Sequence, residues 1–216
     1  MTISTNCILC KHNSLHLFHQ DKNRKYYRCD HCKLVQVPKI YHLSLEEEKK
    51  RYDLHENNID DPLYRNFLSK LSSQLLPLLP QSAVGFDFGC GPSPALADIF
   101  NRAGFEMDIF DAFYYPDKLY LTKKYSFITS TEVVEHLANP GKEIEKLWDL
   151  LLPQGYLAIM TGMVINKARF ENWSYIRDLT HICFFSLETF NWLTHHLEAE
   201  LVLSTQNIVI LQKPDQ

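Results

Sequence analysis

The stretch FDFGCGPSP at residues 86–94 limits the fold of this chain more than any other feature. Gly89 and Gly91 follow a run of apolar residues, and a glycine pair in that place lets a ligand touch the backbone at the carboxyl end of a parallel strand. Dinucleotide-binding proteins put a third glycine where this chain has Pro94. Proline suits the first turn of a helix, so we expect a helix there with Ser93 as its N-cap. The turn therefore predicts an α/β sheet with a ligand at its edge and weakens the dinucleotide interpretation.

Apolar segments and helical patterns alternate from residue 84 onward. Strands are predicted at AVGFDF, FEMDIFD, YSFITST and YLAIMTG, and a closing hairpin at LVLS and NIVILQK. Helices are predicted at PALADIFNRAG, NPGKEIEKLWDLLLPQG and SLETFNWLTHHL, with a long loop before the last one. Strands that alternate with helices form a parallel sheet covered on both faces. The predicted fold class is therefore α/β, a Rossmann-like doubly wound sheet with an antiparallel C-terminal hairpin.

Two C-x2-C pairs, CILC and CDHC, lie near the N-terminus. A β-hairpin predicted from LHLFH and KYYRC would bring the pairs together, and this spacing is typical of a four-thiolate zinc site. Four thiolates leave no open position for water, so Zn²⁺ is expected to be structural, in a small N-terminal zinc ribbon. The alternative is a surface that recruits a substrate or partner. The predicted ligands are Cys7, Cys10, Cys29 and Cys32.

The chain is expected to divide into three parts: a zinc ribbon at residues 1–41, a helical lid and linker at 42–82, and the α/β domain at 83–216. Two helix starts support the middle part. Ser44 and Glu47 have the spacing of a capping box, and Asp61 stands directly before Pro62, which suits the first helical position.

Composition limits the partners. The 216 residues carry a formal net charge of −4 and a pI near 6.2. A protein that grips a nucleic-acid backbone usually has a high pI or a basic stripe, so RNA is the less favoured partner. No apolar stretch has the length of a membrane span, and the N-terminus lacks the layout of a signal peptide. We expect a cytoplasmic protein with no membrane partner, and the sequence carries no signal for an oligomeric state.

A second ligand signal is Asp111, which ends the strand FEMDIFD, where a carboxylate can accept hydrogen bonds from both ribose hydroxyls. Taken together, the motifs resemble those of class I S-adenosylmethionine (SAM)-dependent methyltransferases. The residues that carry the resemblance are FDFGCGPSP, the acidic end of FEMDIFD, FITSTEVVEHLANP, LLPQG with YLAIMT, and WSYIRDLTHICFFS. The resemblance implies the methyltransferase fold, SAM as the cofactor and methyl transfer as the activity.

The resemblance also implies a cofactor site. Its residues would be Asp87, Gly89, Cys90, Gly91, Asp111, Ser130, Thr131 and Glu132. Two departures from the family pattern stand out. Ser126 replaces an aspartate, and the helix and third strand expected between Asp111 and FIT are abridged. The acidic residue that would bind adenine therefore has no firm position, although Asp117 lies in the right stretch.

For chemistry on the methyl acceptor, His181 is the candidate base, because its pKa lies naturally near the working range. Asp178 is the candidate that orients the imidazole. The alternative is that both residues only hold a loop in place. Glu135 and His136 are expected to cap and orient a helix, and Cys183 to be a buried small residue. Lid residues that could reach the acceptor are Tyr52, His55 and Tyr64.

The predicted acceptor is a small polar molecule such as a sugar or sugar nucleotide. Some sugar C-methyltransferases join a zinc-binding module to this core, but they also carry a large C-terminal domain that this chain lacks. A zinc ribbon also precedes the core in a bacterial 23S rRNA guanine methyltransferase, so an RNA base methyltransferase is the first alternative. The second alternative is a SAM-binding protein without turnover. The RNA alternative relies on a basic groove at Lys22, Arg24, Lys25, Arg28 and Lys33.

Overall fold

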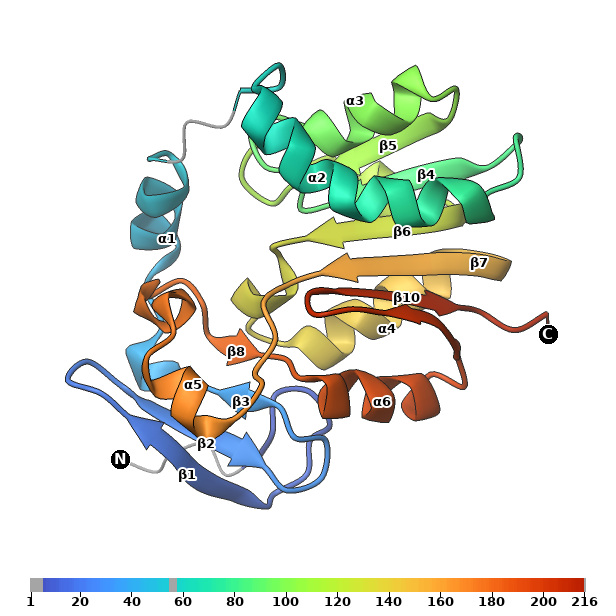
Figure 1. Cartoon of the computed structure of the whole chain (residues 1–216). Helices are drawn as coiled ribbons and strands as arrows, with labels where there is room; N and C mark the ends of the chain where they lie inside the picture. The colour runs from blue at the N-terminus through green and yellow to red at the C-terminus, as the bar shows by residue number, and fades with distance from the viewer. Residues whose placement is uncertain (1–5, 55–57, 216) are drawn as a thin grey trace.

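The computed structural model describes residues 6–54 and 58–215, and its centre is a six-stranded sheet in the order β5-β4-β6-β7-β10-β9 (Figure 1). Strands β5, β4, β6 and β7 are parallel, and β10 runs antiparallel to both β7 and β9. This arrangement confirms the α/β class with an antiparallel C-terminal hairpin. The strands are β4 Val84–Phe88, β5 Glu106–Phe110, β6 Tyr125–Thr131, β7 Leu151–Met160, β9 Glu200–Ser204 and β10 Ile208–Gln212.

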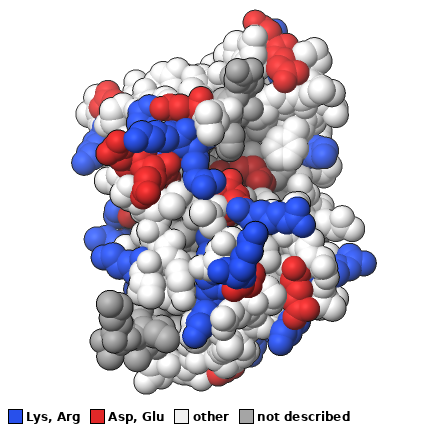
Figure 2. Space-filling model, turned by 90° about the vertical axis from the view of Figure 1, so that its left-hand side faces the viewer, with Lys and Arg blue, Asp and Glu red and all other residues white. Residues whose placement is uncertain are grey.

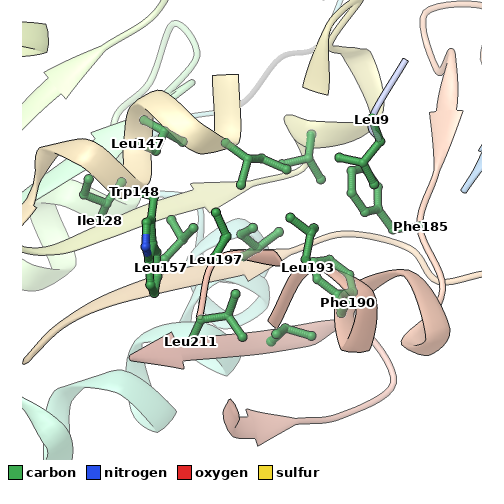
Figure 3. Packing of buried hydrophobic residues seen from close by; sticks show 14 of the residues in the cluster. Leu9, Ile128, Leu147, Trp148, Leu157, Phe185, Phe190, Leu193, Leu197 and Leu211 are labelled. Carbon is green, nitrogen blue, oxygen red and sulfur yellow. The ribbon is translucent and has the colours of Figure 1, made fainter. Parts of the chain in front are cut away.

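Helices cover both faces of this sheet. Successive side chains of β7 enter different clusters: Leu157 packs with α4 and α6, and Ala158 packs with α2 and α3. Figure 3 shows the α4–α6 face, where Trp148, Leu193 and Leu211 surround Leu157. The sheet is therefore doubly wound, as predicted. The helices are α2 Pro62–Leu75, α3 Ala95–Arg102, α4 Pro140–Leu150 and α6 Leu187–His196. Within the described residues, none of the helices is both long enough and apolar enough to span a membrane.

Two helix ends differ from the prediction. Helix α3 begins at Ala95 with Pro94 in the N-cap position and no side-chain cap, so Ser93 is not its N-cap. Helix α4 ends at Leu150, and LLPQG belongs to β7. The reason is Pro153, which cannot donate the backbone hydrogen bond that a helix interior needs.

The lid and the crossover after β5 follow the sequence closely. Helix α1, Leu45–Tyr52, has the predicted capping box: Glu47 N donates to Ser44 Oγ at 3.3 Å, and Ser44 N donates to Glu47 Oε2 at 2.9 Å. Asp61 caps α2 by accepting from Leu63 N at 2.9 Å. Between β5 and β6 the described chain forms only the short 3₁₀ helix η3, Lys118–Thr122, which confirms the abridged crossover. Three further short 3₁₀ helices are η1 Lys39–Tyr41, η2 Leu76–Leu78 and η4 Val134–His136.

The N-terminal ribbon has the predicted hairpin of β1, Leu15–Gln20, and β2, Lys25–Cys29. A third short strand, β3 Val35–Gln36, extends it, and β8, Cys183–Phe184, pairs antiparallel with β3. The sequence predicted a loop at β8. The α/β core thus supplies the fourth strand of the ribbon's own sheet.

The rest of the long loop also folds against the ribbon. It contains α5, Lys167–Glu171, and the 3₁₀ helix η5, Ser174–Arg177. Its Phe170 packs edge-on against Phe18 and Tyr26 of the hairpin, with ring centroids 5.2 Å apart in each pair. This aromatic contact, together with the β3–β8 pairing, makes the ribbon and the loop one packed unit.

The ribbon also docks on the other side, at the start of α4. Leu9, between the first two cysteines, is buried in the core cluster beside Phe185 (Figure 3). A methyl group on Gly141 would overlap the Leu9 carbonyl oxygen. The position therefore admits only a glycine while the ribbon is docked.

We expect Gly141→Ala to lower the free energy of unfolding by about 1–3 kcal/mol, because the backbone of Leu9 must move to make room. Urea unfolding measures this change. Lys142→Ala, at the exposed neighbouring position of the same helix, is the control and should change stability by less than about 0.5 kcal/mol. Equal stability of the two variants would show that the Leu9 contact is not rigid.

Candidate functional site

The four N-terminal cysteines converge on one point. Sγ of Cys7 lies 3.4 Å from Sγ of Cys32, and Sγ of Cys10 lies 3.6 Å from Sγ of Cys29. All four sulfur atoms lie within 4.8 Å of one another, and none is in a disulfide. A tetrahedron with Zn–S bonds of about 2.3 Å has edges of about 3.8 Å. The predicted ligand set is thus brought together with dimensions that fit Zn²⁺.

The two halves of this cluster share one backbone geometry. Cys7 O accepts from Lys11 N, and Cys29 O accepts from Lys33 N, at 3.0 and 3.1 Å. Lys11 and Lys33 have φ of 62° and 64°, a left-handed turn that aims each pair of thiols inward. Non-glycine residues rarely adopt this conformation, and its presence in both halves fits a site in which all four sulfur atoms face one point.

A cavity of about 530 Å³ opens at the carboxyl ends of the parallel strands, beneath α1 and α2. One part of its wall is apolar and aromatic, and the other carries carboxylates and imidazoles. Figure 2 views this side of the molecule, where acidic and basic side chains are interspersed. The lining residues are Glu48, Tyr52, Tyr64, Phe67, Leu68, Phe88, Gly89, Gly91, Pro92, Phe110, Ala112, Phe113, Tyr114, Thr131, Glu132, Val133, His136, Leu137, Asp178 and His181.

The glycine turn borders the cavity as predicted. Gly89 and Gly91 have φ of 81° and 66°, which side chains rarely adopt. A Cβ on Gly89 would overlap Val133, whereas a Cβ on Gly91 would meet nothing within 4 Å. Gly91 therefore leaves open space at the cavity wall, a cradle that a side chain would fill.

Asp111 lies beside the turn, with its carboxylate bonded to the backbone. It accepts from Gly91 N at 3.0 Å and from the amides of Phe113 and Tyr114 at 2.9 and 3.1 Å. These bonds hold the glycine turn against the loop after β5. Asp111 itself is absent from the cavity lining, so its predicted contact with a ribose stays a prediction.

Three other predicted cofactor residues are buried behind the cavity wall. Asp87 accepts from the Thr129 hydroxyl at 2.7 Å, and burial raises the pKa of its carboxyl to about 7. Burial also raises the pKa of the Cys90 thiol. Ser130 is fully buried, and within the described chain its hydroxyl has no hydrogen-bond partner. Of the residues at the end of β6, Thr131 and Glu132 reach the cavity.

Two carboxylates meet at the polar end of the cavity. Glu135 is completely buried and accepts from the hydroxyls of Thr161, at 2.9 Å, and Tyr175. Glu132 accepts from the same Tyr175 hydroxyl at 3.1 Å and has a φ of 53°. Burial, and then the charge of Glu135, raise the pKa of Glu132 to about 8, and burial raises the pKa of Glu135. Glu135 was expected only to cap a helix, because nothing in the sequence tells which carboxylate of the EVVEHL segment turns inward.

His181 lines the cavity as expected, but Asp178 does not orient it. His181 Nδ1 lies 2.8 Å from the Tyr175 carbonyl, which holds the ring. Asp178 Oδ2 is 4.0 Å from His181 Nε2, and the carboxylate accepts instead from the amide and hydroxyl of Thr180. Burial, and then the neighbouring His136, lower the pKa of His181 to about 4.

The remaining predicted residues lie in different parts of the structure. Tyr52 and Tyr64 line the cavity, whereas His55 lies outside the described residues. Asp117 caps η3 by accepting from Leu119 N at 2.9 Å, away from the cavity lining. Cys183 is buried, as predicted, with its thiol 3.0 Å from the Val134 carbonyl.

Arg24 connects the ribbon to the loop that carries His181. Its side chain is buried, with 2% exposed, and its guanidinium donates to the carbonyls of Ile176, Asp178 and Leu179 at 2.8, 2.7 and 3.2 Å. The sequence had placed Arg24 in a basic groove for RNA, and the structure corrects this. Arg28 of the same predicted groove is paired with Glu188.

The fold and the glycine-bordered cavity at the strand ends together define a class I methyltransferase. The family described as methyltransferase domain matches residues 62–204, which is more than half of the chain. The chain therefore belongs to this family, and the predicted class, a SAM-dependent methyltransferase, is confirmed. No significant similarity to a curated protein was found.

Solved structures with the same fold are distant in sequence. A 1,6-didemethyltoxoflavin N1-methyltransferase from Burkholderia thailandensis, bound to its substrate and S-adenosylhomocysteine, has a TM-score of 0.55 at 13% identity, covering 94% of this chain and 100% of that one. A SAM-dependent methyltransferase from Archaeoglobus fulgidus has a TM-score of 0.53 at 16% identity, covering 69% and 94%. The N-methyltransferase NodS from Bradyrhizobium japonicum, with S-adenosylhomocysteine, has a TM-score of 0.50 at 13% identity, covering 78% and 97%.

We expect Arg24→Lys to loosen the loop around His181, because a lysine ammonium offers its donors from one point and cannot span three carbonyls. Stability should fall by about 1–3 kcal/mol, and amide hydrogen exchange should accelerate in residues 174–182. Lys22→Ala, in the same hairpin but exposed, is the control. Unchanged exchange in this segment would show that the β3–β8 pairing alone holds the loop.

Proposed function

We propose that SAM occupies the cavity with its methionine portion at the glycine turn, and that the methyl acceptor is a small polar molecule bound at the opposite, polar end. The observation that carries this proposal is the cradle at Gly91, an open space in a cavity that Phe88, Phe110 and Phe113 also line. SAM bound there would supply a methyl group on a sulfonium, and the acceptor would attack the methyl carbon in line as the sulfur leaves with the electron pair of the broken bond. The task of the protein is to position the two reactants.

The charge of the lining favours an acceptor without phosphate groups. Glu48, Glu132 and Asp178 line the polar end, and none of the described lining residues is a lysine or arginine. A polyanion would bring its charges close to these carboxylates, which is unfavourable at short range. We therefore rank an uncharged, hydroxyl-bearing molecule such as a sugar above a sugar nucleotide, and both above RNA.

His181 remains the proposed group nearest the acceptor's proton. Its Nδ1 faces the Tyr175 carbonyl, so in the neutral ring Nε2 carries the lone pair. With its pKa lowered to about 4, the imidazole is neutral at pH 7 and carries a single proton, on Nδ1. In this proposal, Asp178 positions the loop through Thr180 and does not act on the imidazole directly.

We expect Gly91→Ala to weaken binding of S-adenosylhomocysteine by about tenfold or more, because the added methyl group occupies the cradle and overpacking costs about 1–3 kcal/mol. Calorimetric titration measures the affinity. Gly104→Ala is a matched control: Gly104 also has a positive φ, 92°, and open space around its Cβ position, but it lies at the end of α3 away from the cavity.

Both alanines introduce comparable backbone strain of about 1–2 kcal/mol, so the comparison removes the effect of stability on binding. Equal affinities of the two variants would place the cofactor elsewhere. A well-folded wild-type protein that binds neither SAM nor S-adenosylhomocysteine would overturn the proposed cofactor.

We propose in addition that the four-cysteine cluster holds one structural Zn²⁺. The support is the mutual distance of the sulfur atoms and their repeated left-handed turns. The ion would fasten Leu9 to α4 and hold the hairpin that carries Arg24, so it would stabilise the loop around His181 without touching it.

We expect the purified protein to contain about one zinc per chain, and removal by a chelator to destabilise the ribbon and expose the segment at residues 174–182 to hydrogen exchange. Metal analysis and exchange mass spectrometry measure the two effects. Cys29→Ser should lose the ion, whereas Cys90→Ser, at a buried cysteine outside the cluster, should keep it. Zinc in equal amount in both variants would contradict the assignment.

A further inference from the structure

Two histidines and a carboxylate come together at the polar end of the cavity, far in sequence from the cysteine cluster. One ligand atom each from Glu135, His136 and His181 lies within 4.8 Å of the others. Glu135 and His136 come from η4, and His181 comes from the loop that the ribbon holds. Both imidazoles line the cavity, so the cluster is open to a ligand on one side.

The backbone orients both imidazoles in the same way. His136 Nδ1 lies 3.2 Å from the Thr180 carbonyl, and His181 Nδ1 lies 2.8 Å from the Tyr175 carbonyl. A carbonyl oxygen only accepts, so each Nδ1 carries the proton and Nε2 carries the lone pair. Metal-binding histidines almost always donate their second ring nitrogen in this manner, which fixes the tautomer and the ring orientation.

The neighbouring carboxylates lack a compensating positive charge. Glu135 and Glu132 both contact the Tyr175 hydroxyl, which has one proton to donate. The Thr161 hydroxyl supplies a second donor to Glu135, and among the described residues no lysine or arginine forms an ion pair with either carboxylate. A fully buried carboxylate beside a half-buried one, with so few side-chain donors, calls for a cation or a proton between them.

We propose that Glu135, His136 and His181 bind one divalent transition-metal ion at the acceptor end of the cavity, with the carboxylate of Glu132 beside it. Two imidazoles and a carboxylate suit a first-row ion such as Mn²⁺ or Fe²⁺ better than Mg²⁺ or Ca²⁺, which prefer oxygen ligands throughout. This site is distinct from the four-thiolate site, whose soft sulfur ligands select Zn²⁺.

The chemical role of this ion rests on the proposed function. A hydroxyl of the acceptor that joins the coordination sphere loses its proton more easily, and water at the cavity mouth takes that proton. The oxygen lone pair then forms a bond to the methyl carbon while the carbon–sulfur bond breaks, which yields a methyl ether and S-adenosylhomocysteine. In this arrangement His181 holds the ion instead of the proton, and the acceptor atom is an oxygen.

The test is a titration of MnCl₂ into the zinc-loaded, full-length protein, with free Mn²⁺ followed by electron paramagnetic resonance. We expect one bound Mn²⁺ per chain, and an affinity lowered at least about tenfold in His181→Gln and in Glu135→Gln. If one of these variants fails to fold, His136→Gln supplies a ligand change in another segment. The matched control is His196→Gln, which removes an exposed histidine that lies 3.0 Å from a carboxylate, Glu145, and should leave the affinity unchanged.

The same samples are titrated with S-adenosylhomocysteine without Mn²⁺. Cofactor binding with no Mn²⁺ binding, or with Mn²⁺ binding that His181→Gln and His196→Gln affect equally, overturns the ion site and leaves the proposed function standing. Mn²⁺ binding without any cofactor binding overturns the proposed function, and with it the catalytic role of the ion. Loss of Mn²⁺ in His181→Gln with intact cofactor binding supports both.

Discussion

The antiparallel pairing of β3 with β8 is the interaction on which the rest of this structure depends. It joins a strand of the N-terminal ribbon to a strand of the methyltransferase core. The loop between β7 and α6 would otherwise leave its backbone groups without partners, and buried backbone groups need them. The ribbon supplies these partners through β3 and through Arg24, so the wall of the cavity that carries His181 is built on the ribbon. In this protein the ribbon therefore belongs to the architecture of the site.

The carboxylates at the two ends of the cavity are hydrogen-bonded in different ways. At the glycine turn, the Asp111 carboxylate accepts from three backbone amides, which tie the turn to the loop after β5. At the other end, Glu132 and Glu135 share the hydroxyl of Tyr175. The first arrangement is satisfied without a ligand and gives a rigid support. The second has two carboxylates and few hydroxyl donors, which makes it the end where a polar ligand or an ion is favourable.

Much of the fold was predictable because its signals are local. The capping box at Ser44, the hairpin of β1 and β2 and the four cysteines each depend on residues a few positions apart. The strand β8 has two residues, which is too short to show a periodicity. Its pairing partner β3 lies far away in the sequence, so no local signal marks the pairing. The end of α4 differs from the prediction for another reason: the apolar pattern continues into LLPQG, but Pro153 cannot continue a helix and the segment joins β7.

In the candidate site, too, features with a local sequence signal were predictable, and features that depend on contacts between distant segments were not. The glycine turn, Thr131, Glu132 and His181 line the cavity as predicted, because their positions after strands and in the acceptor loop follow from the chain order. The sequence by itself determined the α/β sheet, the cysteines that cluster in the ribbon and the end of the sheet where the cavity opens, since local periodicity and spacing encode all three. Only the tertiary structure decided that Glu135 turns inward, that the Tyr175 carbonyl holds His181, and that Arg24 is buried. These outcomes depend on contacts between distant segments, where burial and hydrogen-bond geometry select among side chains that are equivalent in the sequence.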